Sequence, residues 1–461
     1  MKKMKNLLSM LMFVCAAAAT AGSPEDATED FQEVIRRSKS RVFPAVVYIR
    51  AVMDNPESGK ESANIISGSG VIIDASGEVL TNYHVIDRVV DIRCQLEDGS
   101  AWPAKIIGGD SELDVALIRL LRDADDTAPL PVAELDAETG HNEGDFVMAM
   151  GAPWGMNRSV SLGIVSCASR YLPGKSNYSL WYQTDASISP GNSGGPLVNI
   201  SGRVIGINTL GSSGGTIGFT VPAETILDVL PRIREYGKVN WSWFGFRFQP
   251  LHDFDRNIYF PWDSGVIISS TEPGSPAREA GFLPNDRLIA VDGEPVTVAT
   301  SEFLPGFRRK LALMPFDRPV NFQVVRGDET ITIAVAPQPK GSATGEALVC
   351  PRWGMSAQGI NRFDTPNLYF YRESGVFIMA VVPKGNAARA GLVAGDIIVS
   401  VNGQPVNTLE ELSGMYDHAV ELVSFRPRAD FIILRNGQTL RKIMDFSNDL
   451  DTDFSNDSDE E

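Results

Sequence analysis

The sequence predicts a mostly β protein, in which an all-β barrel or sandwich is followed by two copies of a smaller α+β domain. The chain of 461 residues is too long for one hydrophobic core and long enough for about three domains. Residues 42–230 consist mainly of short apolar runs separated by turn residues. Beyond them, a segment of 33 residues recurs at an offset of 110 residues.

The first region is expected to form short strands and to end in a helix. Its apolar runs include "PAVVYIRAVM", "DVALIRL" and "RVIGINTLGS", and DG, SG and GG pairs mark turns between such runs. In "VDIRCQLEDGS" the apolar Ile92, Cys94 and Leu96 alternate with polar residues, which predicts a strand with one buried face. Residues 222–238, "PAETILDVLPRIREYGK", then show helical spacing of apolar side chains that stops near Gly237.

The repeat predicts two related domains. Residues 264–296 align without gaps on residues 374–406 and match at 13 of 33 positions. Each copy is interpreted as a strand, a short helix, a second strand, a longer helix and final strands. Two copies of a domain of about a hundred residues explain this period better than a solenoid, whose repeats are shorter.

The two ends of the sequence have biased compositions. Residues 1–21 combine three lysines, an apolar stretch and a run of small residues, which is typical of a secretory signal cleaved after Ala21. Lipidation at Cys15 is a weaker alternative, because the bulky Val14 precedes it. Residues 447–461 hold seven acidic residues and no basic one, which predicts a disordered acidic tail. The spacing of the acidic residues from Asp449 onward is similar to that of a calcium-binding loop, but Phe454 occupies the position at which such a loop needs Gly.

Charge and cysteine content exclude some classes of function. A formal net charge of −17, with no cluster of Lys and Arg, argues against a nucleic-acid partner. Three cysteines lie outside the signal segment, namely Cys94, Cys167 and Cys350. An odd number at wide spacing is not a disulfide framework, so we expect inert thiols in the core.

The stretch "DASISPGNSGGPLVN" (185–199) places Ser193 in a glycine-rich turn. A serine hydroxyl needs a base to remove its proton and donors to stabilise the oxyanion. Among the four histidines, His84 follows an apolar strand in the first region, whereas His141 lies in the polar turn "ETGHNEGD" and is expected to be solvated. Asp114 directly precedes the buried run "VALIRL" and is the predicted partner that orients the imidazole.

The order His84, Asp114, Ser193 is the order of chymotrypsin-like serine proteases. A plain Gly/Ser turn is the alternative, but it does not explain the matching His and Asp upstream. The motifs "TNYHV", "DVALIRL", "GAPWG", "SLGIVS", "QTDASISPGNSGGPLVN", "VIGINT" and "IGFTVP" occur in the order found in the HtrA/Deg family of bacterial envelope proteases, which this chain resembles. The two repeats resemble the PDZ domains that follow the protease in that family.

The resemblance implies a chymotrypsin-like double β-barrel protease domain followed by two PDZ-like α+β domains. The expected boundaries are 1–21 for the signal segment, 30–238 for the protease domain, 242–338 and 346–446 for the PDZ domains, and 447–461 for the tail. It also implies an oxyanion hole at Gly191, Asn192 and Ser193. The primary specificity pocket is expected at Ser187, with Ile207 and Asn208 beside it. Ser187 carries no charge, so we expect cleavage after small aliphatic residues rather than basic ones.

PDZ domains bind a peptide C-terminus by adding it as a strand to a sheet edge. The resemblance assigns the carboxylate-binding loop of the first PDZ domain to Trp243, Phe244, Gly245 and Phe246. In the second domain the counterpart is "RWGM", with Trp353, Gly354 and Met355. Ordinary strands whose aromatic side chains fill the core remain the alternative for both loops.

The expected function is an ATP-independent serine endopeptidase of the periplasm or cell envelope, which degrades misfolded or unfolded proteins and binds C-terminal peptides at its PDZ domains. No metal or organic cofactor is needed, and the resemblance implies a homotrimer or a higher homo-oligomer. The short segment 53–67 makes assembly into a cage doubtful, and "PGFRRKLALMPFDRPV" matches no landmark of the family. Two alternatives stay open: a chaperone or PDZ binding protein with secondary or no proteolysis, and a narrow regulatory protease activated by a PDZ ligand.

Overall fold

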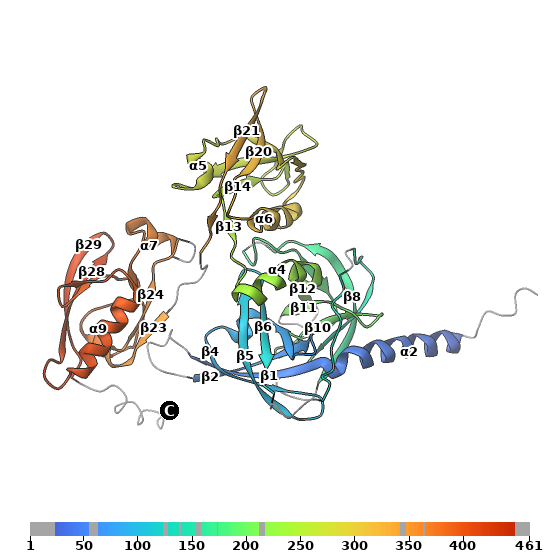
Figure 1. The fold of residues 1–461 in the computed structure, drawn as a ribbon, viewed down its shortest axis with the longest axis horizontal. Helices are drawn as coiled ribbons and strands as arrows, with labels where there is room; N and C mark the ends of the chain where they lie inside the picture. Colours follow the sequence, from blue (N-terminus) through green and yellow to red (C-terminus); the bar gives the residue numbers. More distant parts are fainter. Residues whose placement is uncertain are drawn as a thin grey trace, which may run out of the picture.

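The computed structural model describes residues 24–54, 63–122, 128–137, 140–152, 158–172, 174–211, 217–341, 347–362 and 365–447. The expected signal segment, Cys15 and residues 448–461 of the acidic tail lie outside these ranges. Figure 1 shows two barrels that carry one small domain above them and a second beside them, while helix α2 (Pro24–Val42) points away from the barrels.

The first β region forms two closed six-stranded barrels, so the barrel alternative is confirmed over the sandwich. In the first barrel, β1 pairs with both β2 and β4, which closes the sheet on itself. Its strands are β1 (Val46–Asp54), β2 (Ala63–Ile72), β3 (Glu78–Thr81), β4 (Val89–Gln95), β5 (Ala101–Asp110) and β6 (Val115–Leu120). Short strands with a small-residue run at residues 67–70 allow the tight curvature that closure requires.

In the second barrel, β10 closes the sheet by pairing with β7. Its strands are β7 (Phe146–Gly151), β8 (Ser159–Arg170), β9 (Trp181–Thr184), β10 (Pro196–Asn199), β11 (Val204–Gly211) and β12 (Gly218–Pro222). One continuous apolar core contains side chains from both barrels, including Ile49, Leu117, Met148 and Val204. The two barrels are therefore packed as one unit, and residues from both meet at the boundary between them.

Helix α4 (Ala223–Tyr236) closes the barrel region as the sequence predicts. It buries Ile226, Val229 and Ile233 against the barrel core, and Gly237 ends it in a left-handed conformation with φ 71°. The expected alternation of β4 is also confirmed, since Ile92 and Cys94 are buried between exposed neighbours. Two further helical turns, η1 (Phe43–Ala45) and α3 (Tyr83–Ile86), lie in the first barrel.

Both repeat units adopt the predicted order of strand, short helix, strand, longer helix and final strands. The first contains β13 (Ser242–Trp243), β14 (Phe246–Gln249), β15 (His252–Asp253), β16 (Ile258–Tyr259), β17 (Val266–Thr271), α5 (Pro276–Glu279), β18 (Arg287–Val291), β19 (Glu294–Pro295), η4 (Ser301–Phe303), α6 (Leu304–Ala312), β20 (Val320–Arg326), β21 (Glu329–Val335) and β22 (Gln338–Pro339). The segment that matched no landmark, 305–320, forms most of α6 and the approach to β20.

The second repeat unit has its own apolar core around Trp353, Phe431 and Phe446. It contains β23 (Ala347–Cys350), η5 (Pro351–Trp353), β24 (Met355–Gly359), α7 (Pro366–Tyr371), β25 (Val376–Val381), α8 (Asn386–Arg389), β26 (Ile397–Val401), β27 (Gln404–Pro405), α9 (Leu409–Glu421), β28 (Arg428–Arg435) and β29 (Gln438–Asp445). The mostly β fold with two barrels and two α+β domains is therefore confirmed.

The three cysteines in the described ranges are free thiols. Cys94 and Cys350 are fully buried, and burial raises the pKa of Cys94 to about 12 and that of Cys350 further. A thiol whose pKa lies so high stays protonated and unreactive. Cys167, on β8, is only half-buried. The expectation of a core position is therefore wrong for this residue.

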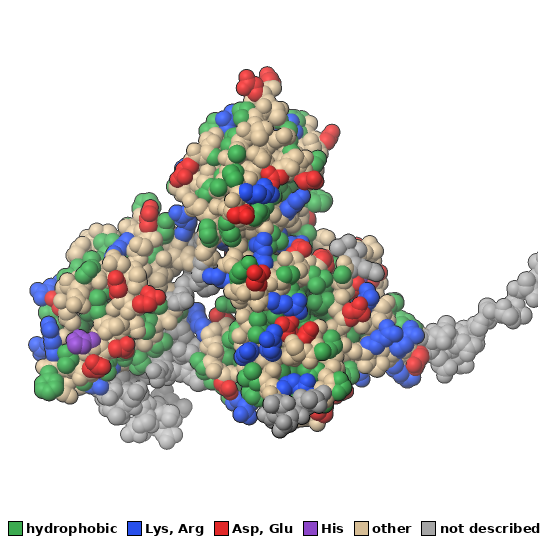
Figure 2. All heavy atoms as spheres, in the orientation of Figure 1, with side chains coloured by type: hydrophobic (Ala, Val, Ile, Leu, Met, Phe, Trp, Pro, Cys, Tyr) green, Lys and Arg blue, Asp and Glu red, His purple; other side chains and the backbone are tan. Residues whose placement is uncertain are grey.

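The visible surface in Figure 2 carries acidic and basic side chains interspersed, with apolar side chains scattered among them. None of the helices in the described ranges is both long and apolar enough to cross a membrane. Within those ranges, no group of three or more His, Cys, Asp or Glu side chains is placed to hold a metal ion.

Candidate active site and peptide-binding groove

His84 and Asp114 lie on two segments of the first barrel that face each other. His84 is in α3, and Asp114 directly precedes β6. Nδ1 of His84 is 2.9 Å from Oδ2 and 3.0 Å from Oδ1 of Asp114, and the backbone amide of His84 donates to Oδ1 at 3.0 Å. Because a carboxylate only accepts hydrogen bonds, Nδ1 donates to Asp114, and in the neutral tautomer that this contact favours the lone pair is on Nε2. The pair is arranged as a general base requires.

The backbone of Asp114 is held in a left-handed conformation, with φ 55°. Three contacts stabilise this uncommon geometry. Its carbonyl accepts from Nδ2 of Asn82 at 2.9 Å, and its carboxylate accepts from His84 and from the hydroxyl of Thr209 on β11. Thr209 was not predicted from the sequence, where "VIGINT" entered only as a family motif. Contact between β11 and Asp114 depends on how the two barrels pack.

A second buried carboxylate, Asp110, shapes the turn that carries Asp114. Its Oδ1 accepts from the amide of Leu113 at 2.9 Å, and its Oδ2 accepts from Nε1 of Trp241 at 2.6 Å. Burial raises the pKa of Asp110 to about 6. Trp241 lies between α4 and β13, so the turn that carries Asp114 is bonded to the connection between the barrels and the first repeat unit.

Ser193 lies at the boundary between the barrels, on the turn before β10. Its hydroxyl donates to the carbonyl of Thr209 at 3.2 Å. Among the hydrogen bonds of the described residues, none joins Ser193 to His84. Catalytic hydrogen bonds of proteases are often formed only with substrate bound, and a rotation about χ1 redirects a serine hydroxyl without moving the backbone. Thr209 therefore contacts both Asp114 and Ser193.

The backbone of the turn around Ser193 is held by the small-residue segment of β2. Ser69 donates its amide to the carbonyl of Ser193 at 2.8 Å and its hydroxyl to the carbonyl of Gly191 at 2.6 Å. Gly194 has φ +85°, and a Cβ there would lie 2.1 Å from the carbonyl oxygen of Ser69. Only glycine allows this approach. Ser69 was missed from the sequence, although a Gly-Ser-Gly run inside an apolar strand is a signal of close backbone contact.

The amides of Gly191 and Ser193 make no hydrogen bond to any described residue, which leaves both free to bind an oxyanion. Asn192 differs from the expectation. Its amide donates to the carbonyl of Ser189 at 2.9 Å, and its side chain is buried, with Oδ1 unpartnered within the described structure. The assignment of Asn192 to the oxyanion hole is therefore corrected, because its donor is already used inside the turn.

The three residues expected at the specificity pocket have different positions. Ser187 is exposed, whereas Ile207 and Asn208 are fully buried. Ile207 packs in the core, and both side-chain atoms of Asn208 are bonded, Nδ2 to the carbonyl of Pro196 and Oδ1 to Thr220. These two do not line an open pocket, since strand β11 turns their side chains into the barrel.

Ile188, which was not predicted, lies beside Gly211 at the end of β11 and Gly218 at the start of β12. A Cβ on Gly211 would lie 2.4 Å from the carbonyl oxygen of Ile188, and a Cβ on Gly218 would lie 2.5 Å from its Cδ1. The chain is therefore packed closely at this place, and the side chain of Ile188 is buried between the two segments.

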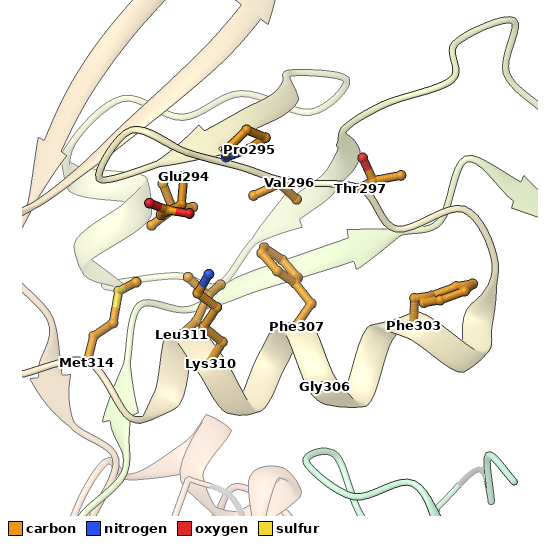
Figure 3. Close-up of a pocket in the computed structure, with 11 residues that line it drawn as sticks. Glu294, Pro295, Val296, Thr297, Phe303, Gly306, Phe307, Lys310, Leu311 and Met314 are labelled. Carbon is orange, nitrogen blue, oxygen red and sulfur yellow. The ribbon is translucent and has the colours of Figure 1, made fainter. Parts of the chain in front are cut away.

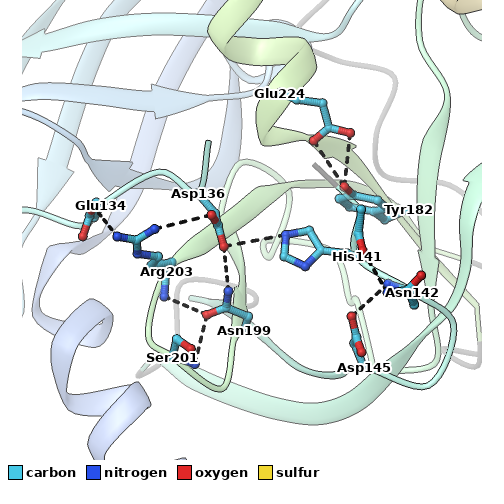
Figure 4. Close-up of polar contacts among 11 residues, drawn as sticks. Glu134, Asp136, His141, Asn142, Asp145, Tyr182, Asn199, Ser201, Arg203 and Glu224 are labelled. Carbon is cyan, nitrogen blue, oxygen red and sulfur yellow. Dashed lines mark hydrogen bonds and ion pairs between the residues drawn. The ribbon is translucent and has the colours of Figure 1, made fainter. Parts of the chain in front are cut away.

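His141 is not solvated as expected but takes part in a polar cluster of the second barrel (Figure 4). Its side chain is 13% exposed, and Nε2 lies 3.7 Å from Oδ2 of Asp136. Its ring stands edge-on to Tyr182, whose hydroxyl donates to Glu224. Burial raises the pKa values of Tyr182 and Glu224. The turn therefore lies against the barrel, with the ring of His141 packed between Asp136 and Tyr182.

The expected carboxylate-binding loop of the first repeat unit has free donors. Neither Phe244 nor Gly245 uses its amide in a hydrogen bond to another described residue. Gly245 has φ +79°, and a Cβ there would lie 2.1 Å from Cβ of Ser275, so this position requires glycine. Phe244 is in the core, and Trp243 and Phe246 are half-buried at its edge.

This loop opens into a groove of about 650 Å³ between β14 and α6. β14 is the edge strand of its sheet, so its outer side is available to a further strand. The protease barrels form part of the groove wall through Asn177 and Tyr178. The ring of Tyr178 also stacks on Trp241, with centroids 4.4 Å apart.

The second repeat unit differs at the same place. Strand β23 pairs antiparallel with β24, from Ala347 opposite Gln358 to Cys350 opposite Met355, and α9 packs against both strands. The chain's own strand therefore occupies the edge to which a peptide would be added. The amide of Gly354 donates within η5, and Trp353 and Met355 are fully buried. The peptide-binding assignment of Trp353, Gly354 and Met355 is corrected, because these residues build the core and a covered sheet edge.

Comparisons with known proteins agree with this architecture. Residues 68–207 match the family described as "Trypsin-like peptidase domain", and residues 242–336 and 377–424 match families described as "PDZ domain". A probable periplasmic serine endoprotease DegP-like from Halomonas elongata is 33% identical over 388 residues, which cover 80% of this chain and 79% of the relative. The periplasmic serine endoprotease DegP of Salmonella typhimurium is 32% identical over 365 residues, covering 78% and 73%.

Solved structures show the same similarity. The HtrA-type protease AlgW with a tripeptide is 29% identical, with a TM-score of 0.57, and the match covers 66% of this chain and 97% of that one. The serine endoprotease from Yersinia pestis is 27% identical, with a TM-score of 0.51 and coverage of 66% and 97%.

Proposed function

The chain belongs to the family of DegP-like periplasmic serine endoproteases, and we propose that it degrades misfolded or unfolded proteins in the periplasm without ATP. One observation carries this proposal. The His84–Asp114 pair, at 2.9 Å, lies with Ser193 at the boundary of the two barrels, and the amides of Gly191 and Ser193 donate to no described residue. An unfolded protein exposes extended segments that can reach this boundary.

The proposed reaction is acyl transfer. Oγ of Ser193 attacks the carbonyl carbon of the scissile peptide bond, and its proton passes to Nε2 of His84. Asp114 stabilises the imidazolium, and the amides of Gly191 and Ser193 donate to the oxyanion. The imidazolium then protonates the leaving amine. A water molecule, deprotonated by His84, attacks the acyl carbon. The bond from that carbon to Oγ of Ser193 then breaks, and the imidazolium returns the proton to Oγ. Cleavage after small aliphatic residues is proposed because Ser187, at the expected pocket, carries no charge to bind a basic side chain.

The first PDZ domain is proposed as the peptide receptor. Free amides at Phe244 and Gly245, together with the open edge of β14, support capture of a C-terminal carboxylate. The second PDZ domain is proposed to have a structural role, since β23 covers its corresponding edge. We place the domains at residues 30–238, 242–338 and 346–446, preceded by a cleaved signal segment at 1–21.

A homotrimer is proposed as the working assembly. The rings of Phe31 on α2 and Phe146 on β7 lie 5.0 Å apart and remain 37% and 44% exposed. Exposed aromatic side chains of this kind favour burial against another protomer. The mass of the protein in solution, measured by light scattering, tests this assembly.

The protease proposal is tested with unfolded casein and the full chain. We expect fragments with the wild type and none with Ser193→Ala, and a fluorophosphonate should label only the wild type. Intact casein at elevated temperature, together with no labelling of Ser193, would contradict proteolysis and favour a chaperone or PDZ binding protein.

Regulation is the second candidate, because the groove of the first PDZ domain is partly walled by Asn177 and Tyr178 of the protease domain. A peptide in this groove therefore contacts both domains. The same casein assay, repeated with a C-terminal peptide added, distinguishes the two modes. A general protease cleaves casein without the peptide, whereas a narrow regulatory protease cleaves casein only when the peptide is present.

A further inference from the structure

The charged side chains that line the groove between β14 and α6 are mainly basic, although the protein as a whole is acidic. Its lining contains four cationic side chains and one carboxylate, Glu272, against a formal net charge of −17 for the whole chain. The cations are Arg247, Arg256, Arg308 and Lys340. Such a local reversal of charge creates a potential that attracts acidic groups.

Two of these cations already have partners near the groove. Lys340 forms an ion pair with Glu112 of the protease domain, and Arg256 lies 3.7 Å from Asp253. Arg247 is 3.8 Å from Glu272 and is 69% exposed, so this pair is weak. Arg308 makes no ion pair or hydrogen bond with any residue that the structure describes. Arg247 and Arg308 are therefore the cations that are available to a ligand.

Arg247 lies on β14, beside the path that an added peptide strand would follow, and Arg308 lies on α6 across the groove. Along β14, Phe246 and Phe248 point toward the core and α6, with the rings of Phe248 and Phe307 5.0 Å apart. Because side chains alternate along a strand, Arg247 points to the opposite face. A peptide strand paired with β14 alternates in the same way, so every second side chain faces Arg247.

The three consecutive basic residues of helix α6, Arg308, Arg309 and Lys310, have different surroundings. Arg309 donates to Asp228, Thr225 and the carbonyl of Tyr178 on the protease domain. Lys310 lines a separate cavity of about 310 Å³ on the other side of the helix, with Phe303 and Phe307 (Figure 3). Only Arg308 of the three lines the groove. Lys310 is thus a matched control for charge on the same helix.

We infer that the first PDZ domain selects C-terminal segments in which acidic residues precede an apolar last residue. Leu311, Phe244 and Phe246 provide the apolar part of the site, while Arg247 and Arg308 provide the positive charge beyond it. The inference rests on the proposed role of this domain as the peptide receptor.

The test uses the full chain carrying Ser193→Ala and four fluorescein-labelled octapeptides, measured by fluorescence anisotropy. Three peptides share a C-terminal valine with a free carboxylate and carry three Glu, three Gln or three Lys at the fourth to sixth positions from the end. The fourth is the Glu peptide with an amidated C-terminus. We expect the Glu peptide to bind ~3- to 10-fold more tightly than the Gln peptide in low salt, and the Lys peptide to bind most weakly.

Variants and salt separate a specific contact from a general effect of charge. Arg308→Gln and Arg247→Gln should each reduce the advantage of Glu over Gln, and the double variant should remove it. Lys310→Gln should keep it, and high salt should weaken it. Equal binding of the Glu and Gln peptides, or an equal loss with Lys310→Gln, would overturn the acidic preference. Equal binding of the free and amidated peptides, or no binding at all, would instead overturn the role of the domain as a receptor of C-termini.

Discussion

At the scale of single residues, the conformation of Asp114, the proposed partner of His84, depends on side chains from three separate segments. Asn82 bonds the carbonyl of Asp114, Thr209 bonds its carboxylate, and Asp110 shapes the turn before it. Because Asp114 has φ 55°, its backbone is stable only while such contacts persist. The orientation of His84 therefore depends on residues that never touch a substrate.

Replacement of Thr209 by valine is expected to lower kcat/KM about ten-fold or more. The change removes a hydrogen bond to a charged carboxylate, worth about 1.5–3 kcal/mol, at nearly constant volume. Because the contact orients the imidazole, kcat should fall while KM stays nearly constant. Steady-state cleavage of a fluorogenic peptide measures both constants. Thr209→Ser keeps the hydroxyl and should restore most of the activity; a valine variant as active as the wild type would refute this role.

Asp110 should make stability depend on pH between about 4 and 6. Its folded-state pKa of about 6 exceeds the unfolded value of about 3.8, so the folded protein binds the proton more tightly. The resulting stability is fully present below pH 3.8 and is lost as the pH rises through 6. Relative to Asp110→Asn, the wild-type protein should gain on the order of 3 kcal/mol as the pH falls from 7 to 4.

Thermal unfolding at several pH values, in the Ser193→Ala background, measures this difference for Asp110. Glu97→Gln replaces an exposed carboxylate of the same barrel and serves as the control, for which no such trend is expected. If the difference in unfolding free energy between the wild type and Asp110→Asn is the same at pH 7 and pH 4, the raised pKa of Asp110 is contradicted.

At the scale of elements, the two PDZ domains use the same strand differently. The repeat equates β14 with β24, and both pair with the next strand in the same antiparallel manner. In the first domain β14 is an open edge, while in the second β23 and η5 form a hairpin-like arm that covers β24. The arm runs antiparallel to β24, with its C-terminal end at the loop, as a bound peptide would.

One peptide should therefore bind per chain. Isothermal titration of the Ser193→Ala protein with a C-terminal peptide should give a stoichiometry near one, as the single open edge implies. Gly245→Ala should abolish binding, because its φ of +79° and the 2.1 Å approach to Ser275 leave no room for a Cβ. A circular dichroism spectrum checks that the variant is folded. Two equivalent sites per chain would contradict the covered edge of β24.

At the scale of the whole molecule, the protease and first PDZ domains are joined by polar contacts around α6 and Trp241. Arg309 donates to three groups of the protease domain, Arg232 donates to the carbonyl of Leu313, and Lys340 pairs with Glu112. Trp241 bonds Asp110 and stacks on Tyr178 at the centre of this junction. The peptide groove and the turn of the catalytic acid are thus linked by contiguous contacts.

Arg309→Ala should loosen this junction. It removes three donors to the protease domain, so the first PDZ domain should sample more orientations and the radius of gyration measured by X-ray scattering should increase. Lys310→Ala, on the same helix but facing away, is the matched control and should leave the scattering curve unchanged. Indistinguishable curves for Arg309→Ala and the wild type would show that Arg309 does not hold the domains together.

The sequence by itself determined the order of the domains, the mostly β fold and the three residues His84, Asp114 and Ser193. These features follow from local signals: short apolar runs, a repeat at a fixed offset, and reactive residue types in motifs. The closing helix at 223–236 and the alternation in β4 were predictable for the same reason, because each depends on side chains within one element.

The tertiary structure alone decided which neighbours complete the sites. Thr209 reaches Asp114, and Ser69 holds the Ser193 turn, only because two separately closed barrels pack together. Burial of Ile207 and Asn208, the inward turn of Asn192 and the covered edge of β24 depend likewise on long-range pairing. The two PDZ loops look alike as sequence, since both are aromatic-glycine-apolar runs. They differ because β23 pairs with β24 in the second domain, whereas no strand pairs with the outer edge of β14 among the described residues. The residues of the loop alone do not predict this pairing.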